Sequence, residues 1–250
     1  MTPKTRRPVA YGAGSASLAA ALAVPYLMFT RLRAAPDAAF GGWLMPVVPP
    51  MVSAATGALL IPHLPAGQLR LTLLLACYAL FGISLVASVL VITQLWQRLV
   101  RHSIGPAAMV PTLWIVLGPL GQSITAASLL GAAARLVLPP PYGPAFQALG
   151  LVYGVPVWGF AVLWAALATA ITIRAARAHL PFSLTWWSFT FPVGTCVTGR
   201  SALALHTGAD ALRFGAVVLY LGLVAAWAGV SACTARGAWH GRLFLPAATI

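Results

Sequence analysis

Seven long apolar runs, separated by short polar connections, dominate the pattern along this chain of 250 residues. A helix needs about 20 mostly apolar residues to cross the hydrocarbon core of a bilayer, and each run is of that order. None shows the alternating segments of about ten residues that are typical of membrane β-strands. The pattern therefore predicts about seven transmembrane helices, at residues 11–32, 43–61, 71–95, 109–134, 146–173, 184–206 and 213–234.

The segments outside these runs are short and rich in proline, glycine and arginine. Such residues favour turns and mark the ends of helices. Residues 1–10 form a basic N-terminal tail and residues 235–250 a C-terminal tail, so residues 11–234 are predicted to form one transmembrane helical domain. The expected fold class is an all-α integral membrane protein.

The composition supports a lipid environment. Sixty per cent of the residues are hydrophobic and 7% are charged, whereas a soluble domain carries about 25% charged residues. The 15 lysines and arginines outnumber 2 acidic residues, but they stand singly or in pairs between apolar runs. A nucleic-acid partner is therefore not expected. The three cysteines and five histidines have no ligand-like spacing, so we expect no metal and no cofactor.

The arginines also predict an orientation in the bilayer. Positively charged residues of short loops stay in the cytoplasm, so the side with more arginines, and the C-terminus with it, is predicted to be cytoplasmic. We expect a multi-pass protein of the plasma (inner) membrane. Lys4, Arg6 and Arg7 fall on the other side, a conflict that points to preceding spans absent from the chain. The eight arginines of the richer side are Arg31, Arg33, Arg98, Arg101, Arg174, Arg177, Arg236 and Arg242.

A repeated feature distinguishes the second, fourth and sixth runs. In each, a proline is followed within three or four residues by polar side chains, which lie on the same helical face. Proline removes one helical hydrogen bond and bends the chain, and the freed carbonyl must meet protein or water. We predict that these proline-kinked helices line a central pathway, although small residues and prolines also serve ordinary helix packing. The groups are Pro49 with Ser53, Pro119 with Gln122 and Ser123, and Pro192 with Thr195.

The acidic residues help to define the solute. Asp37 and Asp210 both lie in connections, whereas proton-coupled pumps and cation sites usually use carboxylates within the membrane. The absence of carboxylates from the predicted spans favours an anion as the solute, although backbone dipoles can also bind cations. An enzyme is not expected, because the serine in Gly-Gln-Ser at 121–123 is not followed by the glycine of a G-x-S-x-G motif.

The segment LPFSLTWWSFTFPVGTCVTG (180–199) resembles the tellurite-resistance/dicarboxylate transporter family. This family includes yeast malate transporters, fungal sulfite efflux pumps and plant slow-type anion channels. The segments GGWLMPVVPPMVSAATG (41–57) and PTLWIVLGPLGQSITAAS (111–128) are similar to other pore helices of the family. The resemblance extends over nearly the whole chain.

This resemblance implies about ten helices in five tandem hairpins, with the odd-numbered helices around a central pore, and a homotrimer with one pore in each subunit. The chain would correspond to the C-terminal part of that bundle, because it lacks room for the first three helices. The resemblance also implies that a phenylalanine of the penultimate helix plugs the pore, and by motif this residue is Phe191.

Local chemistry is consistent with this role for Phe191. The residue precedes a proline, which biases it away from regular helix geometry and would aim its ring at the pathway; the alternative is an aromatic ring that packs in the core. Thr195 and Thr198 fall near the same helical face. Arg200 falls half a turn away, and we expect it to reach the outer interface or Asp210.

The expected function is a membrane channel or carrier for small anions such as dicarboxylate, sulfite or halide, with Phe191 as the gate. The alternative is a truncated, non-transporting helix-bundle subunit in the membrane. The candidate pore-lining residues are Pro49, Ser53, Pro119, Gln122, Ser123, Pro192, Thr195 and Thr198.

Overall fold

The computed structural model describes the backbone of residues 3–31, 35 and 37–241, and the side chains of these ranges from residue 16 onward. Parts of both predicted tails, together with Arg33 and Arg242, lie outside the described residues. The elements along the chain are α1 (Pro3–Arg31), η1 (Gly41–Leu44), α2 (Pro49–Leu60), η2 (Ile61–His63), α3 (Gln68–His102), η3 (Ala107–Val116), α4 (Leu117–Val137), α5 (Tyr142–Arg177), η4 (Leu184–Phe189), α6 (Phe191–Thr207) and α7 (Asp210–Trp239), where η denotes a 3₁₀ helix.

Each predicted span overlaps an α-helix or a 3₁₀ helix that is followed by an α-helix. The described residues contain no strand. Within the part of the chain that the structure describes, four segments are by themselves long and apolar enough to cross a membrane, namely α3, α5, α7 and the continuous stretch Ala107–Val137 of η3 and α4. The all-α membrane fold expected from the sequence is therefore confirmed.

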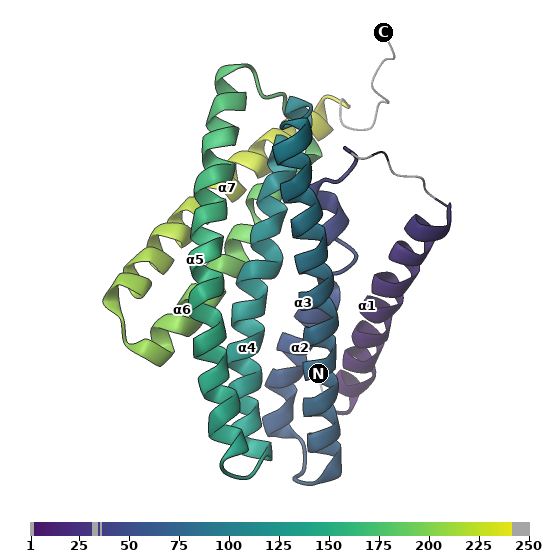
Figure 1. Cartoon of the computed structure of the whole chain (residues 1–250), viewed down its shortest axis with the longest axis vertical. Helices are drawn as coiled ribbons and strands as arrows, with labels where there is room; N and C mark the ends of the chain where they lie inside the picture. The colour runs from purple at the N-terminus through teal and green to yellow at the C-terminus, as the bar shows by residue number, and fades with distance from the viewer. Residues whose placement is uncertain (1–2, 32–34, 36, 242–250) are drawn as a thin grey trace.

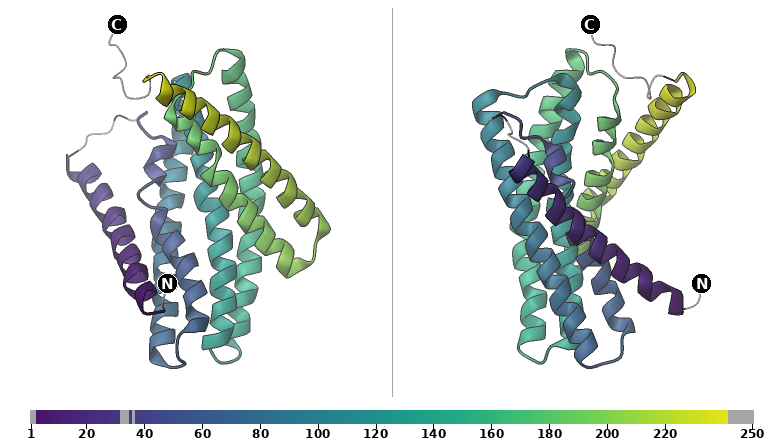
Figure 2. Two further views of the ribbon diagram at one scale, coloured as in Figure 1. Left: turned by 180° about the vertical axis from the view of Figure 1, so that it is seen from behind. Right: turned by 90° about the vertical axis from the view of Figure 1, so that its right-hand side faces the viewer.

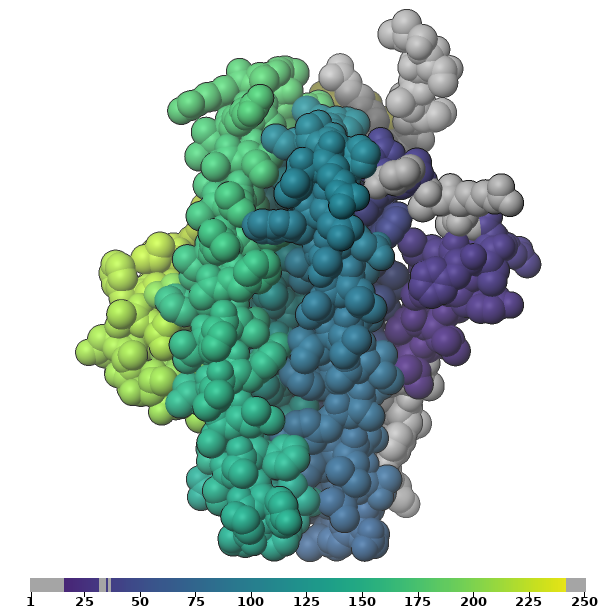
Figure 3. Space-filling model, in the orientation of Figure 1, coloured from purple at the N-terminus to yellow at the C-terminus, as the bar shows by residue number. Residues whose placement is uncertain are grey.

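Helix α4 forms the centre of the bundle. Of its 21 residues 13 are buried, against 6 of 36 in α5 and 2 of 30 in α7. It packs against α2, α3, α5 and α6. Helices α3 and α5 cover one face of the bundle, and the opposite view has α2 and α6 in front, with α7 packed on α6 (Figures 1 and 2). In the space-filling view the side chains of α3 and α5 meet along one continuous face (Figure 3). Helices α5 and α7 are mostly exposed yet apolar, which is expected where lipid is the solvent.

The three prolines of the repeated feature lie at breaks between 3₁₀ and α-helical segments. Pro49 is the first residue of α2, Pro119 the third of α4, and Pro192 the second of α6. A proline is tolerated in the first turn because the N–H groups there have no partner inside the helix. The sequence predicted kinks within continuous helices; the structure instead changes helix type close to each proline.

Two glycines let α4 and α6 approach each other closely. A Cβ atom at Gly121 would overlap the backbone of Thr195 and Cys196, and one at Gly199 would lie 2.7 Å from the Gly121 carbonyl oxygen. Small residues at membrane helix interfaces allow such backbone contact. Gly121 and Gly199 therefore determine the spacing of the two helices that carry most of the candidate site.

The arginine-rich helix ends lie together. Helices α3, α5 and α7 finish at the same end of the bundle (Figure 1). Their last turns contain Arg101, Arg174, Arg177 and Arg236. The prediction that this end of the bundle is cytoplasmic depends on these arginines lying together.

Candidate functional site

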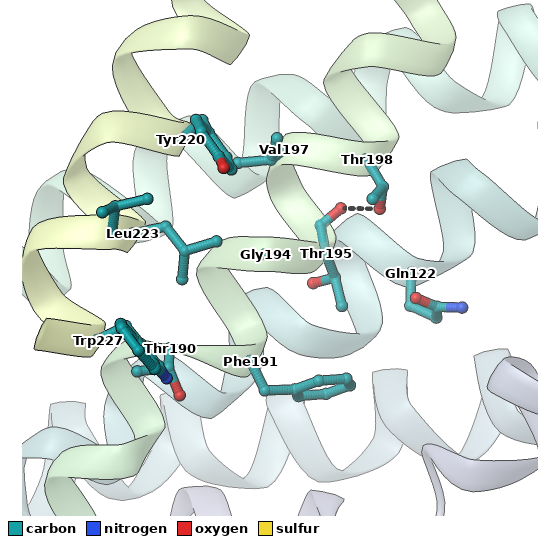
Figure 4. Close-up of a pocket in the computed structure, with 11 residues that line it drawn as sticks. Gln122, Thr190, Phe191, Gly194, Thr195, Val197, Thr198, Tyr220, Leu223 and Trp227 are labelled. Carbon is teal, nitrogen blue, oxygen red and sulfur yellow. Dashed lines mark hydrogen bonds between the residues drawn. The ribbon is translucent and has the colours of Figure 1, made fainter. Parts of the chain in front are cut away.

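An open groove of about 680 Å³ runs along α6, between α4 and α7. Its lining comes from all three helices and from the residue that joins η4 to α6 (Figure 4). The residues that line it are Gln122, Thr190, Phe191, Gly194, Thr195, Val197, Thr198, Tyr220, Leu223, Val224 and Trp227. Four predicted site residues are thus brought together here: Gln122, Phe191, Thr195 and Thr198.

Phe191 begins α6, directly after the break that follows η4. Its side chain is 55% exposed, so it is not an aromatic of the core. The edge of its ring lies next to Gly118 of α4, where a Cβ atom would be 3.6 Å from the ring. In Figure 4 the ring extends away from Trp227 of α7, toward the side on which Gln122 lies. A large apolar ring therefore projects from the first residue of α6, beside the first turn of α4.

Thr195 is buried and joins α6 to the start of α4. Its hydroxyl lies 2.7 Å from the carbonyl oxygen of Pro192 in its own helix. The carbonyl oxygens of Leu117 and Gly118, in the first turn of α4, lie 3.2 and 3.1 Å away. Because a threonine hydroxyl has one hydrogen to donate, these carbonyls share a single donor. The hydroxyl thus links two helices where their backbones are irregular.

Replacing Thr195 by valine should lower the thermal stability of the protein. Valine keeps nearly the same shape but leaves buried carbonyl groups without this donor, which costs about 1–3 kcal/mol. Thermal unfolding in detergent measures the loss. Thr234→Val is the matched control, because the Thr234 hydroxyl bonds only the Val230 carbonyl within α7. Equal shifts in the two variants would contradict a special role for Thr195.

Thr198 and Thr125 connect α6 and α4 further along the groove. Their hydroxyl oxygens lie 2.9 Å apart, and each also lies within hydrogen-bonding distance of a carbonyl oxygen of its own helix, that of Thr195 for Thr198 and that of Gly121 for Thr125. Because each hydroxyl has one hydrogen, one of the two donates to the other across the helices while the other donates to its own helix. The sequence prediction did not include Thr125. Its position three residues after Gln122, on the same helical face, is the signal that would have found it.

The other predicted lining residues lie outside the groove. Pro119, Ser123 and Pro192 are buried, and the Ser123 hydroxyl donates to the Leu120 carbonyl of its own helix at 2.9 Å. Pro49 and Ser53 belong to α2, where the Ser53 hydroxyl is 3.1 Å from that of Ser17 in α1. Their role as pore lining stays a prediction.

The groove is lined by neutral groups only. Its polar atoms come from threonine and tyrosine hydroxyls, the Gln122 amide and an indole. Among the described residues, no three His, Cys, Asp or Glu side chains come together as a metal site would need. Such a lining can pass or hold a small solute beside hydrogen-bond donors.

Arg200 lies outside this lining. Its guanidinium donates to the carbonyls of Ala211 and Leu212 in the first turn of α7, at 2.8 and 3.0 Å. It also lies 5.1 Å from the ring centre of Trp158 in α5. Of the two outcomes expected for Arg200, a contact with Asp210 is wrong, because Asp210 is paired with Arg213 instead, at 3.4 Å; a position at the outer interface stays a prediction. Arg200 connects α5, α6 and α7.

Comparison with known proteins assigns the family. The profile of the SLAC1 voltage-dependent anion channel family matches residues 9–235. The chain belongs to this family. The SLAC1 family is one of channels and transporters, which confirms both the family resemblance drawn from the pore-helix segments and the expectation that the chain is not an enzyme.

Curated relatives of the SLAC1 family include fungal and archaeal proteins. Sulfite efflux pumps of Trichophyton rubrum and Arthroderma otae are each 30% identical over 193 residues, which is 75% of this chain and 51% of each pump. An uncharacterized transporter of Methanocaldococcus jannaschii is 26% identical over 225 residues, 89% of this chain and 63% of that protein. The chain thus spans about half the length of the fungal pumps. No solved structure matches it significantly.

Proposed function

We propose that this chain forms a pathway for small anions along α4 and α6, and that the ring of Phe191 gates it. One observation carries the proposal: a half-exposed phenylalanine projects into an uncharged groove whose polar groups are threonine and tyrosine hydroxyls, a glutamine amide and an indole. An apolar constriction opposes ions because it sheds water, and it conducts when it is widened.

The charges of the chain favour an anion as the solute. The formal net charge is +13, and both acidic residues, Asp37 and Asp210, lie outside the groove. The threonine hydroxyls of the groove donate to backbone carbonyls or to a neighbouring threonine, so the Gln122 amide and the Tyr220 hydroxyl are the groups that would replace part of an anion's hydration shell. A cation site would usually use carboxylates, which this groove does not contain. The relatives described as sulfite efflux pumps support sulfite as one solute; dicarboxylate and halide are the others that we propose.

Reconstitution tests this function directly. The purified chain is inserted into vesicles loaded with sulfite, malate or chloride, and efflux is compared with that from protein-free vesicles. We expect anion efflux well above the background, with potassium efflux unchanged. If vesicles with well-folded protein released all three anions no faster than protein-free vesicles, the proposal would be contradicted. That result would support the alternative, a non-transporting helix-bundle subunit.

The proposed setting is the plasma (inner) membrane, with a cytoplasmic C-terminus and a homotrimeric assembly. Reporter fusions after Arg101 and Arg177, at the ends of α3 and α5, should report a cytoplasmic location. Fusions near Gln68 and Tyr142, at the starts of these helices, should report an external one. The physical reason is that arginines of short loops are retained in the cytoplasm. An external C-terminus would reverse this orientation.

A further inference from the structure

A second groove lies on the face of the bundle that α3 and α5 cover, between α3, η3 and α5. Its volume is about 200 Å³. It shares no lining residue with the proposed pathway. The residues that form its walls and floor include Trp96, Val100, Leu113, Trp164, Leu167 and Ile171.

Two tryptophans shape this groove. Trp164 of α5 is 3% exposed, and its indole N–H donates to the Leu113 carbonyl of η3 at 2.9 Å. Trp96 of α3 is 42% exposed and lies 6.0 Å from Trp164, measured between ring centres. Trp164, at the floor of the groove, is thus hydrogen-bonded to η3, the 3₁₀ part of a predicted pore helix. Trp96, on the outer wall, is partly exposed.

The groove opens beside the basic ends of α3 and α5. The last turn of α3 contains Arg101 and His102, and that of α5 contains Arg174 and Arg177. Leu167, Ile171 and Arg174 follow one another at spacings of four and three residues, so the exposed Arg174 continues the stripe that lines the groove. No acidic residue lies on α3, η3 or α5.

We infer that this groove is a binding site for one anionic phospholipid. An acyl chain would lie along the apolar walls between Trp96 and Ile171, and the phosphate would meet Arg174 at the rim. Tryptophan rings are favoured at the level of lipid headgroups, and basic residues beside a membrane surface attract anionic lipids. Since the floor is tied to η3, the bound lipid would hold η3, and through it the start of α4, in position.

The test compares two lipids that differ only in the headgroup. The chain is purified in mild detergent with equimolar phosphatidylglycerol and phosphatidylcholine that have identical acyl chains, and retained lipid is counted by native mass spectrometry. We expect one phosphatidylglycerol per chain in preference to phosphatidylcholine. Equal retention of both lipids, retention of neither, or a second copy of the chain in place of lipid would each overturn the inference.

Three variants locate the site. Arg174→Gln should lower phosphatidylglycerol retention about fivefold, because one arginine near anionic headgroups is lost. Val100→Trp, at a side chain that is 73% exposed, should block the groove and abolish retention without loss of folding. Arg213→Gln, an exposed arginine at the start of α7, is the matched control and should retain lipid as the unmodified chain does. Unchanged retention in both Arg174→Gln and Val100→Trp would refute a site in this groove.

Discussion

Replacing Phe191 by alanine should increase anion efflux from reconstituted vesicles by about tenfold or more. The change removes an apolar ring from the groove, while Pro192 and the break before α6 remain. A tenfold increase corresponds to a barrier lowered by about 1.4 kcal/mol, a modest demand for removing a dewetting constriction. Efflux of sulfite, measured at matched protein density, is the primary readout.

The stability of the same variant separates a gate from a packing residue. A fully buried phenylalanine costs about 3–5 kcal/mol when it is truncated to alanine. Because the Phe191 side chain is 55% exposed, we expect a loss well below that range and near-normal expression. Phe191→Leu, which keeps an apolar side chain in the groove, should leave efflux closer to that of the unmodified chain.

A second control uses Arg200, which is near Phe191 in sequence but outside the groove. Arg200→Ala removes the hydrogen bonds to the α7 carbonyls of Ala211 and Leu212. It should therefore reduce stability more than it changes efflux. Well-folded Phe191→Ala protein with unchanged efflux would remove the gate from the proposed function and leave the family and fold as they are.

The helical spans were predictable because lipid permits few alternatives. Backbone groups in a bilayer must be paired within the segment, so a long apolar run implies a helix. The run at 71–95 is the interior of α3, Gln68–His102. The helix extends beyond the run at both ends because polar residues, among them Arg98 and Arg101, continue the helical hydrogen bonding outside the apolar stretch. Apolar length therefore predicts where a helix lies but underestimates how far it continues.

Which side chains of a helix line the groove and which are buried was less predictable. Gln122 and Ser123 are neighbours in α4, yet Gln122 lines the groove and Ser123 is buried. Successive residues of a helix differ by about 100° in direction, and only the packing of α5 and α6 around α4 determines which direction is open. The prolines indicated irregular backbone correctly, but nothing in their spacing specified a 3₁₀ segment before each α-helix.

Arg200 illustrates a third kind of limit on prediction from sequence. Its distance from Asp210 along the chain made an ion pair reasonable, but Arg213 is three residues from Asp210 in the same helix and pairs with it. Arg200 instead reaches backbone carbonyls that α7 presents because of the angle at which it packs on α6. Such partners depend on tertiary geometry, so a list of charged residues does not contain them.

Replacing Gly121 by alanine should destabilise the protein by about 1–3 kcal/mol, the usual cost of forcing extra atoms into a packed interior. The added Cβ atom would overlap the backbone of Thr195 and Cys196, which cannot rotate aside as a side chain can. Helices α4 and α6 would therefore separate, and the hydrogen bond between Thr125 and Thr198 would lengthen with them. Gly121→Leu should abolish folding.

The decisive comparison is with the same substitution at a helical glycine that has free space. Gly222 lies within α7, and a Cβ atom there would meet nothing within 4 Å. Gly222→Ala should be neutral or stabilising by up to about 1 kcal/mol, because alanine has the higher helix propensity. Thermal unfolding and size-exclusion profiles in detergent would measure both variants side by side. If the Gly121→Ala protein were as stable as the Gly222→Ala protein, α4 and α6 would not be in close contact at Gly121. The groove, whose shape depends on the spacing of these helices, would then be incorrect as well.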